Sequence, residues 1–186
     1  VLGSPISHSL SPRLHMSAYK FLNIAGNYEA FDVPAGTLKS FLSDKNRGWT
    51  GFSLTMPLKE EVLSVADVVD PIVKRIQSGN TLVKQGEQWN LYSTDVVGFQ
   101  NAWRAKNSDQ PQSVLIVGSG ATARTAAAAF DNSDTSISVL HRNSDREQSM
   151  MDAVSKATLN FLPWHFSDVF YKHDLVVNTT PKGALD

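Results

Sequence analysis

The stretch VLIVGSGATA at residues 114–123 decides the fold of this chain. Its first four residues form a short, entirely apolar run, which is typical of a parallel strand buried on both faces of a sheet. The pattern G-x-G-x-x-A follows, and an alanine-rich helix is expected over residues 124–130. Gly118 permits a tight turn, Gly120 lets the backbone approach a pyrophosphate, and Ala123 allows close helix packing, while the first helical N–H groups can bind the anion. The stretch therefore predicts a dinucleotide-binding loop, made by Gly118, Ser119, Gly120, Ala121, Thr122 and Ala123.

The sequence after this loop continues the same architecture. Apolar runs at residues 137–140, about 20 residues downstream, and at residues 175–178 predict further strands. Strand-like runs alternate with helical patterns along the whole chain, which indicates an α/β fold with parallel strands. The second half is therefore predicted to be a Rossmann-like nucleotide-binding domain, incomplete in this chain. The alternative is a wound α/β domain that binds no nucleotide.

The end of the second strand of such a domain carries the choice of cofactor. NAD-binding domains place an acidic residue there to bind the ribose hydroxyls, whereas arginine accommodates the 2′-phosphate of NADP. This chain has Arg142 at the strand end and Arg146 shortly after it. Two guanidinium groups suit bidentate, charge-assisted recognition of a phosphate, so NADP is the predicted cofactor. The alternative is that both arginines are solvated and that Asp145 turns inward to favour NAD.

The first half of the chain also mixes helices and strands. An apolar stripe over residues 14–22 indicates a helix, and two strand-like runs around Gly86 indicate a hairpin over residues 81–92. Residues 107–112 have the composition of a linker, so the chain divides into a domain of residues 1–106 and a nucleotide-binding domain of residues 107–186. The other expected elements are strands at 28–33 and 51–55 and helices at 38–42 and 96–105.

The pentapeptide TMPLK at residues 55–59 places a lysine in the first turn of a predicted helix. Pro57 suits the first helical position because its φ is fixed and it has no N–H to lose, and Lys59 follows two residues later. A cation there faces the positive end of the helix dipole, which disfavours the ammonium form. Lys59 is therefore a candidate for proton transfer. The alternative is a surface lysine whose charge is offset by Glu60 and Glu61.

The composition limits the classes of molecule that the chain is expected to bind. The net charge of −1 over 186 residues gives no electrostatic footprint for nucleic acid or an anionic membrane, so a small molecule is the default partner. No apolar run approaches the length of a membrane span. The chain has no cysteine, and its five histidines lack metal-ligand spacing, so no metal site is predicted. The chain opens on Val1 rather than Met and stops at Asp186 after a strand-like run, which suggests a fragment truncated at both ends.

The chain also carries six ordered segments with a common resemblance. They are GSPISHSLSP at 3–12, TMPLK at 55–59, GNT at 79–81, TDVVG at 94–98, the loop at Gly118, and VNTTP at 177–181. In this order and spacing they resemble shikimate dehydrogenase, an NADP-dependent enzyme of aromatic amino acid and chorismate biosynthesis. The resemblance implies an N-terminal α/β substrate domain, a C-terminal Rossmann domain, and a cleft in which 3-dehydroshikimate is reduced to shikimate. It also implies a cytoplasmic enzyme that is a monomer or a homodimer.

The resemblance assigns roles by position. Ser9 and Ser11 would hydrogen-bond the substrate carboxylate, and Thr55 would assist at the ring. Asn80 and Asp95 would bind ring hydroxyls. Lys59, paired with Asp95, would be the catalytic acid/base. The resemblance thus implies that Lys59 and Asp95 are the catalytic residues.

Each of these residues also has a structural alternative. Ser11, with proline at the next position, or Asp95 could serve as a helix N-cap. Asn80 after glycine could be a turn residue, and Thr55 could be only a β-former.

Two departures from the family pattern leave the substrate open. The family usually has Asn where Ser53 and Ser93 stand, and serine offers a shorter reach and fewer hydrogen bonds than asparagine. The leading expectation is therefore a shikimate dehydrogenase, with two alternatives. One is a paralogue that acts on quinate or a related hydroxylated cyclohexane carboxylate, and the other is a ligand-binding relative without turnover.

Overall fold

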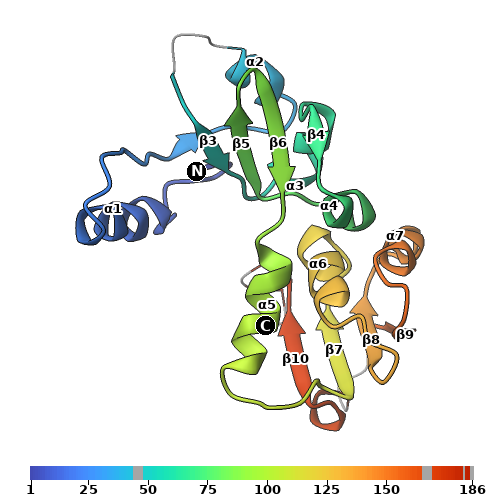
Figure 1. Ribbon diagram of the computed structural model, residues 1–186. Helices are drawn as coiled ribbons and strands as arrows, with labels where there is room; N and C mark the ends of the chain where they lie inside the picture. Colours follow the sequence, from blue (N-terminus) through green and yellow to red (C-terminus); the bar gives the residue numbers. More distant parts are fainter. Residues whose placement is uncertain (44–47, 165–168, 182, 185–186) are drawn as a thin grey trace. The chain divides into compact units, whose positions relative to one another are not determined.

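The computed structural model describes every residue except 44–47, 165–168, 182 and 185–186. Helices and strands alternate along the chain, as the sequence predicts (Figure 1). The chain forms two compact units, Val1–Val73 with Gly79–Ser93 and Lys74–Ser78 with Thr94–Asp186. The division falls before the helix at 95–104, which the linker composition of 107–112 had assigned to the first half. No helix in the described part of the chain is long and apolar enough to cross a membrane.

The first unit is built on a mixed sheet. Strands β3 (Gly51–Ser53), β5 (Thr81–Gln85) and β6 (Gln88–Tyr92) are antiparallel, and β4 (Val68–Val69) runs parallel to β6 at the edge. This confirms the predicted hairpin. A second pair, β1 (Leu2–Gly3) and β2 (Phe31–Asp32), is parallel and continues the sheet through a bridge between Leu2 and Leu54.

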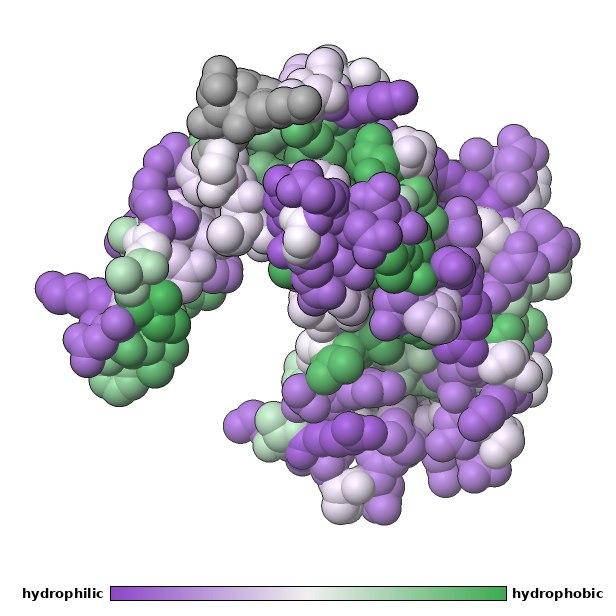
Figure 2. All heavy atoms as spheres, turned by 45° about the horizontal axis from the view of Figure 1, so that its top comes forward, coloured by the Kyte–Doolittle hydropathy of each residue, from purple (hydrophilic) through white to green (hydrophobic). Residues whose placement is uncertain are grey.

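Short helices surround this sheet. They are α1 (Ser11–Phe21), α2 (Leu38–Leu42) and α3 (Leu58–Glu61), with the 3-10 turn η2 (Val62–Ser64) after α3. The core lies between α2, α3 and the sheet, where Leu38, Leu58 and Leu82 are fully buried. In contrast, α1 buries no residue, and apolar side chains gather on its surface (Figure 2), among them Leu14 and Phe21.

The second unit is built on a four-stranded parallel sheet. Its strand order is β10 (Leu175–Asn178), β7 (Ser113–Val117), β8 (Ser136–His141) and β9 (Thr158–Pro163). The central strand β7 is buried from Val114 to Val117, as its apolar sequence predicts. The helices of this unit are α5 (Asp95–Arg104), α6 (Ala121–Ala129) and α7 (Glu147–Asp152), with the 3-10 turns η3 (Ser144–Arg146) and η4 (Phe170–Lys172).

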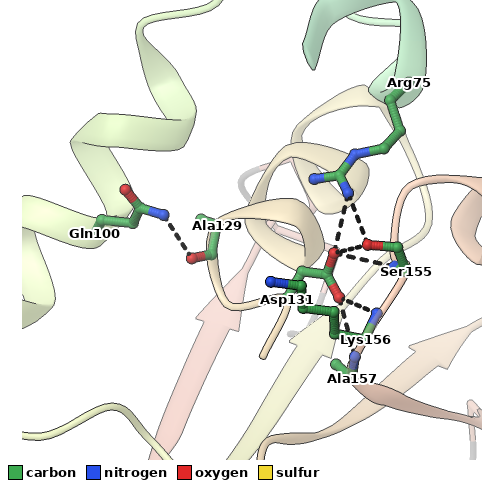
Figure 3. Close-up of polar contacts among 7 residues, drawn as sticks. All are labelled: Arg75, Gln100, Ala129, Asp131, Ser155, Lys156 and Ala157. Atoms are coloured by element: carbon green, nitrogen blue, oxygen red, sulfur yellow. Dashed lines mark hydrogen bonds and ion pairs between the residues drawn. The ribbon is translucent and has the colours of Figure 1, made fainter. Parts of the chain in front are cut away.

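Helix α5 packs on α6, and the amide of Gln100 donates to the carbonyl of Ala129 at 3.0 Å (Figure 3). A further helix, α4 (Pro71–Ile76), lies across the division of the two units, because its last three residues belong to the second unit. The end of α4 is held there by Arg124, which is only 4% exposed and donates to the carbonyl oxygens of Ile76, the last residue of α4, and of Gln77, which follows it, at 2.7 and 3.0 Å.

The carboxylate of Asp131 is a second group, besides Arg124, that holds separate segments of this unit together (Figure 3). It accepts hydrogen bonds from the backbone N–H groups of Ser155, Lys156 and Ala157 at 2.7 to 3.0 Å, and from the Ser155 hydroxyl at 2.8 Å. Arg75 of α4 adds an ion pair at 3.0 Å. Burial acts to raise the pKa of Asp131, but the hydrogen bonds from Ala157, Lys156 and Ser155 outweigh it and lower the pKa to about 2.

Candidate functional site

The segment at Ser9 and Ser11 enters α1 in a way that the sequence did not predict. We expected Ser11 as an N-cap with Pro12 at N1, but the helix begins at Ser11, its cap residue is Leu10, and no side chain caps it. The N-cap alternative for Ser11 is therefore wrong. Instead the hydroxyl of Ser9 accepts a hydrogen bond from the N–H of Ser11 at 3.3 Å. The Ser11 hydroxyl is therefore not used as a cap.

Thr55 lies two residues after the end of β3, beside the first loop of the chain. Its N–H donates to the carbonyl of Leu2 at 2.9 Å, and Ser4 donates to the carbonyl of Met56 at 3.0 Å. Gly3 has no room for a side chain, because an added Cβ would collide with the methyl group of Thr55. These backbone hydrogen bonds join the first loop to the segment after β3. The strand ends at Ser53 rather than at the predicted residue 55, so Thr55 lies outside it and the alternative that Thr55 is only a strand former is wrong.

Lys59 lies in the first turn of a helix, as predicted, although the helix begins one residue later than expected. Pro57 is the N-cap rather than the first helical residue, with φ −93° and ψ 11° outside the helical range. The carboxylate of Glu61, one of the two acids expected to offset the lysine charge, accepts the N–H groups of Gly36 and Leu38 at 2.8 and 3.1 Å. The Glu61 carboxylate therefore binds backbone N–H groups at the N-terminus of α2.

Asn80 is brought to Lys59 through the backbone. The N–H of Gly79 donates to the carbonyl of Lys59 at 2.9 Å, and the N–H of Leu54 donates to the carbonyl of Asn80 at 2.8 Å. The side-chain oxygen of Asn80 accepts the hydroxyl of Thr81 at 2.8 Å. Asn80 thus directly precedes β5 and hydrogen-bonds through its backbone to Leu54 and Tyr92, so it is not a turn residue and that structural alternative is wrong.

Asp95 is the first residue of α5, which belongs to the second unit, whereas Lys59 belongs to the first. The cap residue of α5 is Thr94, so the N-cap alternative for Asp95 is also wrong. The pairing of Lys59 with Asp95 stays a prediction.

A hollow of about 240 Å³ lies in the first unit between α1 and the sheet. Its lining includes Ser53, Thr81, His15 and Tyr28. The rings of His15 and Tyr28 are stacked, with centroids 4.0 Å apart and planes 8° from parallel. The sequence offered no signal for this pair, because neither residue belongs to a motif of known chemistry.

The nucleotide-binding loop has the backbone that the sequence predicts. Gly118 has φ +106°, which L side chains rarely adopt, and an added Cβ would lie 2.6 Å from the Thr179 hydroxyl. Gly120 precedes α6 in an extended conformation, and no side chain caps the helix. The N–H groups of its first turn can therefore serve an anion. Ala121 and Thr122 begin the helix, and Ala123 is fully buried.

The two arginines at the end of β8 are placed differently. Arg146 lies over the glycine loop, because its Nη1 would be 3.4 Å from a Cβ added at Gly120. Arg142 stacks on the ring of Trp164 at 4.0 Å and donates to the carbonyl of Ala184 at 2.8 Å. Both are exposed. The Arg146 guanidinium therefore lies beside the predicted pyrophosphate site. The Arg142 guanidinium is fixed just after β8 by the Trp164 ring and the Ala184 carbonyl.

Comparisons with known proteins agree with this architecture. Residues 1–82 match the family described as shikimate dehydrogenase substrate binding domain. A shikimate dehydrogenase (NADP(+)) of Ignicoccus hospitalis is 32% identical over 98% of this chain and 68% of its own length. One of Thermus thermophilus is 34% identical over 82% of this chain and 58% of its own length. The crystal structure of shikimate 5-dehydrogenase from Thermus thermophilus, in complex with NADP(H) and shikimate, has a TM-score of 0.83 and 31% identity over 96% of this chain and 66% of that one. The chain thus spans roughly 58 to 68% of the length of these relatives.

Proposed function

The chain belongs to the shikimate dehydrogenase family, and from this premise we propose that it catalyses the NADP-dependent reduction of 3-dehydroshikimate to shikimate in the cytoplasm. The observation that supports the proposal is that one chain has a glycine loop before an uncapped helix and, in its other unit, the predicted substrate ligands close together. Ser9 and Ser11 would lie in the first loop of that unit and Thr55 in the segment hydrogen-bonded to it. Its named relatives are NADP(+)-dependent enzymes.

The residues of the second unit fit this cofactor. Gly118 and Gly120 leave the loop without side chains where a pyrophosphate must approach, and the first turn of α6 offers uncapped N–H groups. Arg146 lies over the same loop, and Arg142 supplies a second guanidinium at the end of β8. Two cations at this edge support a dinucleotide that carries a 2′-phosphate.

The residues of the first unit fit a small hydroxylated carboxylate. The hydroxyls of Ser9 and Ser11 would bind the carboxylate, and the Ser9–Ser11 hydrogen bond holds them in one turn. Thr55 and Asn80 would bind at the ring, from the segments just after β3 and just before β5.

Lys59 would be the general acid that protonates the substrate carbonyl oxygen. When bound, NADPH supplies the hydride that adds to the carbonyl carbon. Lys59 as ammonium would donate its proton to the carbonyl oxygen, which becomes a hydroxyl, and the neutral amine would take a proton from solvent. Asp95 would accept a hydrogen bond from the neighbouring substrate hydroxyl and orient the ammonium. In the direction of oxidation, the same amine accepts the hydroxyl proton.

The test is turnover by the purified protein with shikimate and NADP, followed by absorbance of the reduced cofactor. We expect reduction of NADP with shikimate, and much less with NAD. If neither shikimate nor quinate yields reduced cofactor between neutral and mildly alkaline pH, the proposal is abandoned in favour of a ligand-binding relative.

Ser53 supports one alternative substrate. It stands where the family usually has asparagine, and it lines the hollow beside α1, so the chain has room at this point for a larger or more hydroxylated ring. Quinate is the second candidate for this reason. The ratio of kcat/KM for the two acids decides between them, and Ser53→Asn should move that ratio toward shikimate by refilling the space.

A further inference from the structure

The phenol oxygen of Tyr28 is unusual in this molecule. Among the residues that the structure describes, it is the one buried side-chain oxygen or nitrogen without a hydrogen-bond partner. Burying a hydroxyl without a partner destabilises the folded state, so buried polar groups are nearly always paired. A buried hydroxyl that lacks a fully formed hydrogen bond within the protein is a candidate for a bond to a ligand.

The ring that carries this oxygen is held firmly. It stacks on His15, and the Nδ1 atom of His15 lies 2.9 Å from the carbonyl oxygen of Ser11 in the first turn of α1. On the other side, the N–H of Tyr28 donates to the side chain of Asn27 at 2.9 Å. The position of the phenol is thus set by the same helix that begins with Ser11.

Two serines lie near the oxygen. Burial raises the pKa of the Tyr28 phenol, and the hydroxyls of Ser53 and Ser11 act in the opposite direction because they lie close to it. Neither serine hydroxyl has the distance and angle of a full hydrogen bond to the phenol oxygen. The three hydroxyls therefore converge on one place, beside the hollow that Tyr28 and Ser53 line.

We propose that Tyr28 is a specificity-determining residue of the substrate site, whose hydroxyl donates a third hydrogen bond to the substrate carboxylate beside Ser9 and Ser11. The inference rests on the proposed function, because Ser11 is a predicted carboxylate ligand. An ionised carboxylate accepts about four hydrogen bonds, so two serines leave room for a further donor. The substrate carboxylate would also supply the hydrogen-bond acceptor that the phenol lacks. A charged acceptor forms a stronger hydrogen bond with the phenol than a neutral group would.

The variant that tests the inference is Tyr28→Phe, which removes the hydroxyl and keeps the ring stacked on His15. We expect KM for shikimate to rise roughly 10-fold, because the variant loses a hydrogen bond to a charged group. The KM for NADP should not change. The melting temperature should stay the same or rise, because the variant removes an unpaired buried group. Tyr19→Phe is the matched control, since Tyr19 lines the same hollow and contacts the edge of His15; it should leave KM for shikimate unchanged.

A second ligand identifies the group that the hydroxyl contacts. With the methyl ester of shikimate, whose carboxylate is masked, wild type and Tyr28→Phe should differ much less than with shikimate. An equal penalty on acid and ester, an unchanged KM for shikimate, or a fall in melting temperature would each overturn the inference while leaving the proposed function intact. A wild-type protein that neither oxidises shikimate nor gains thermal stability from it would overturn both.

Discussion

A hydrogen bond of 2.9 Å joins the backbone N–H of Gly79 to the carbonyl oxygen of Lys59. Gly79 has no space for a side chain, because an added Cβ would collide with the buried side chain of Leu91. The packing of β6 therefore fixes where the segment with Asn80 meets the helix with Lys59. A predicted proton donor and a predicted substrate ligand, which lie far apart in the sequence, share one structural support.

Lys59→Ala is expected to lower kcat by about 10² to 10⁴-fold and to change KM for shikimate much less, because the residue is proposed to act in proton transfer. Steady-state kinetics with shikimate and NADP measures both values. Lys39→Ala, at an exposed lysine of α2, is the control and should behave as wild type. A Lys59→Ala enzyme with near-normal kcat would return Lys59 to the class of surface lysines.

Asp95→Asn is expected to lower kcat and to raise KM for shikimate together, since the carboxylate is proposed to contact the substrate and to orient the lysine. Losing a negative charge from the first turn of α5 should cost no more than about 1 kcal/mol of stability, so the melting temperature should change little. Asp109→Asn, at an exposed position, is the control. A variant with lower stability and unchanged kinetics would show a purely structural aspartate.

Arg142→Ala is expected to raise KM for NADP and to leave KM for NAD nearly unchanged, because a guanidinium gains its charge-assisted bond only when the 2′-phosphate is present. Arg146→Ala should act in the same direction but more weakly. Arg104→Ala, at an exposed arginine of α5, should affect neither cofactor. If the wild-type enzyme prefers NAD, or if Arg142→Ala weakens both cofactors equally, Asp145 becomes the residue to examine.

Gly118→Ala is expected to lower the melting temperature and to raise KM for NADP. Its φ of +106° costs an L side chain on the order of 1–3 kcal/mol. The added methyl group would also press on the Thr179 hydroxyl, which is held by a 2.7 Å bond to the carbonyl of Val117. The control is Gly98→Ala, in α5, where a Cβ meets nothing within 4 Å. That change should stabilise the protein by about 0.5–1 kcal/mol.

Asp131→Asn is expected to destabilise the second unit at neutral pH by on the order of 2 kcal/mol, because the amide cannot accept all the bonds that the carboxylate accepts. The pKa of Asp131 is about 2 in the folded protein, below its ordinary value of 3.8. The contribution is therefore complete above about pH 4 and is lost as the pH falls toward 2. Urea unfolding over this range should show the difference between wild type and variant shrinking with acid. Asp134→Asn, at an exposed aspartate of the same turn, should show no such trend.

The sequence predicted best where one local rule acts alone. The buried strand from Val114 to Val117, the turn at Gly118 and the helix after it follow from composition and spacing, and the structure confirms them. The strand β9 and the helix α7 were not predicted, because β9 alternates in burial at a sheet edge and α7 has only six residues.

The errors at Ser11 and Pro57 share a cause. Both helices begin one residue away from the position that the proline suggested, and in both the chain just before the helix forms a turn of its own, with Ser9 N–H bonded to the carbonyl of Ile6 and Leu58 N–H to that of Thr55. The role proposed for Tyr28 could not be predicted from the sequence for a different reason. It depends on the stacking of Tyr28 with His15 and on the unsatisfied phenol oxygen, and no local sequence pattern encodes either feature.

Helix α4 belongs to both units, and this has a practical meaning for dissecting the protein. Residues 75–77 are held by Arg124 and Asp131, and Asp131 itself is hydrogen-bonded to the segment from Ser155 to Ala157. During synthesis, the second unit therefore cannot complete its anchors until the ribosome has passed residue 157. No single cut yields two self-contained fragments, because a piece ending at residue 93 would carry residues 74–78, which belong to the other unit, and three of them have their hydrogen-bond or ion-pair partners in the other piece. Separate expression of the substrate half would require replacing residues 74–78 with a linker of similar span.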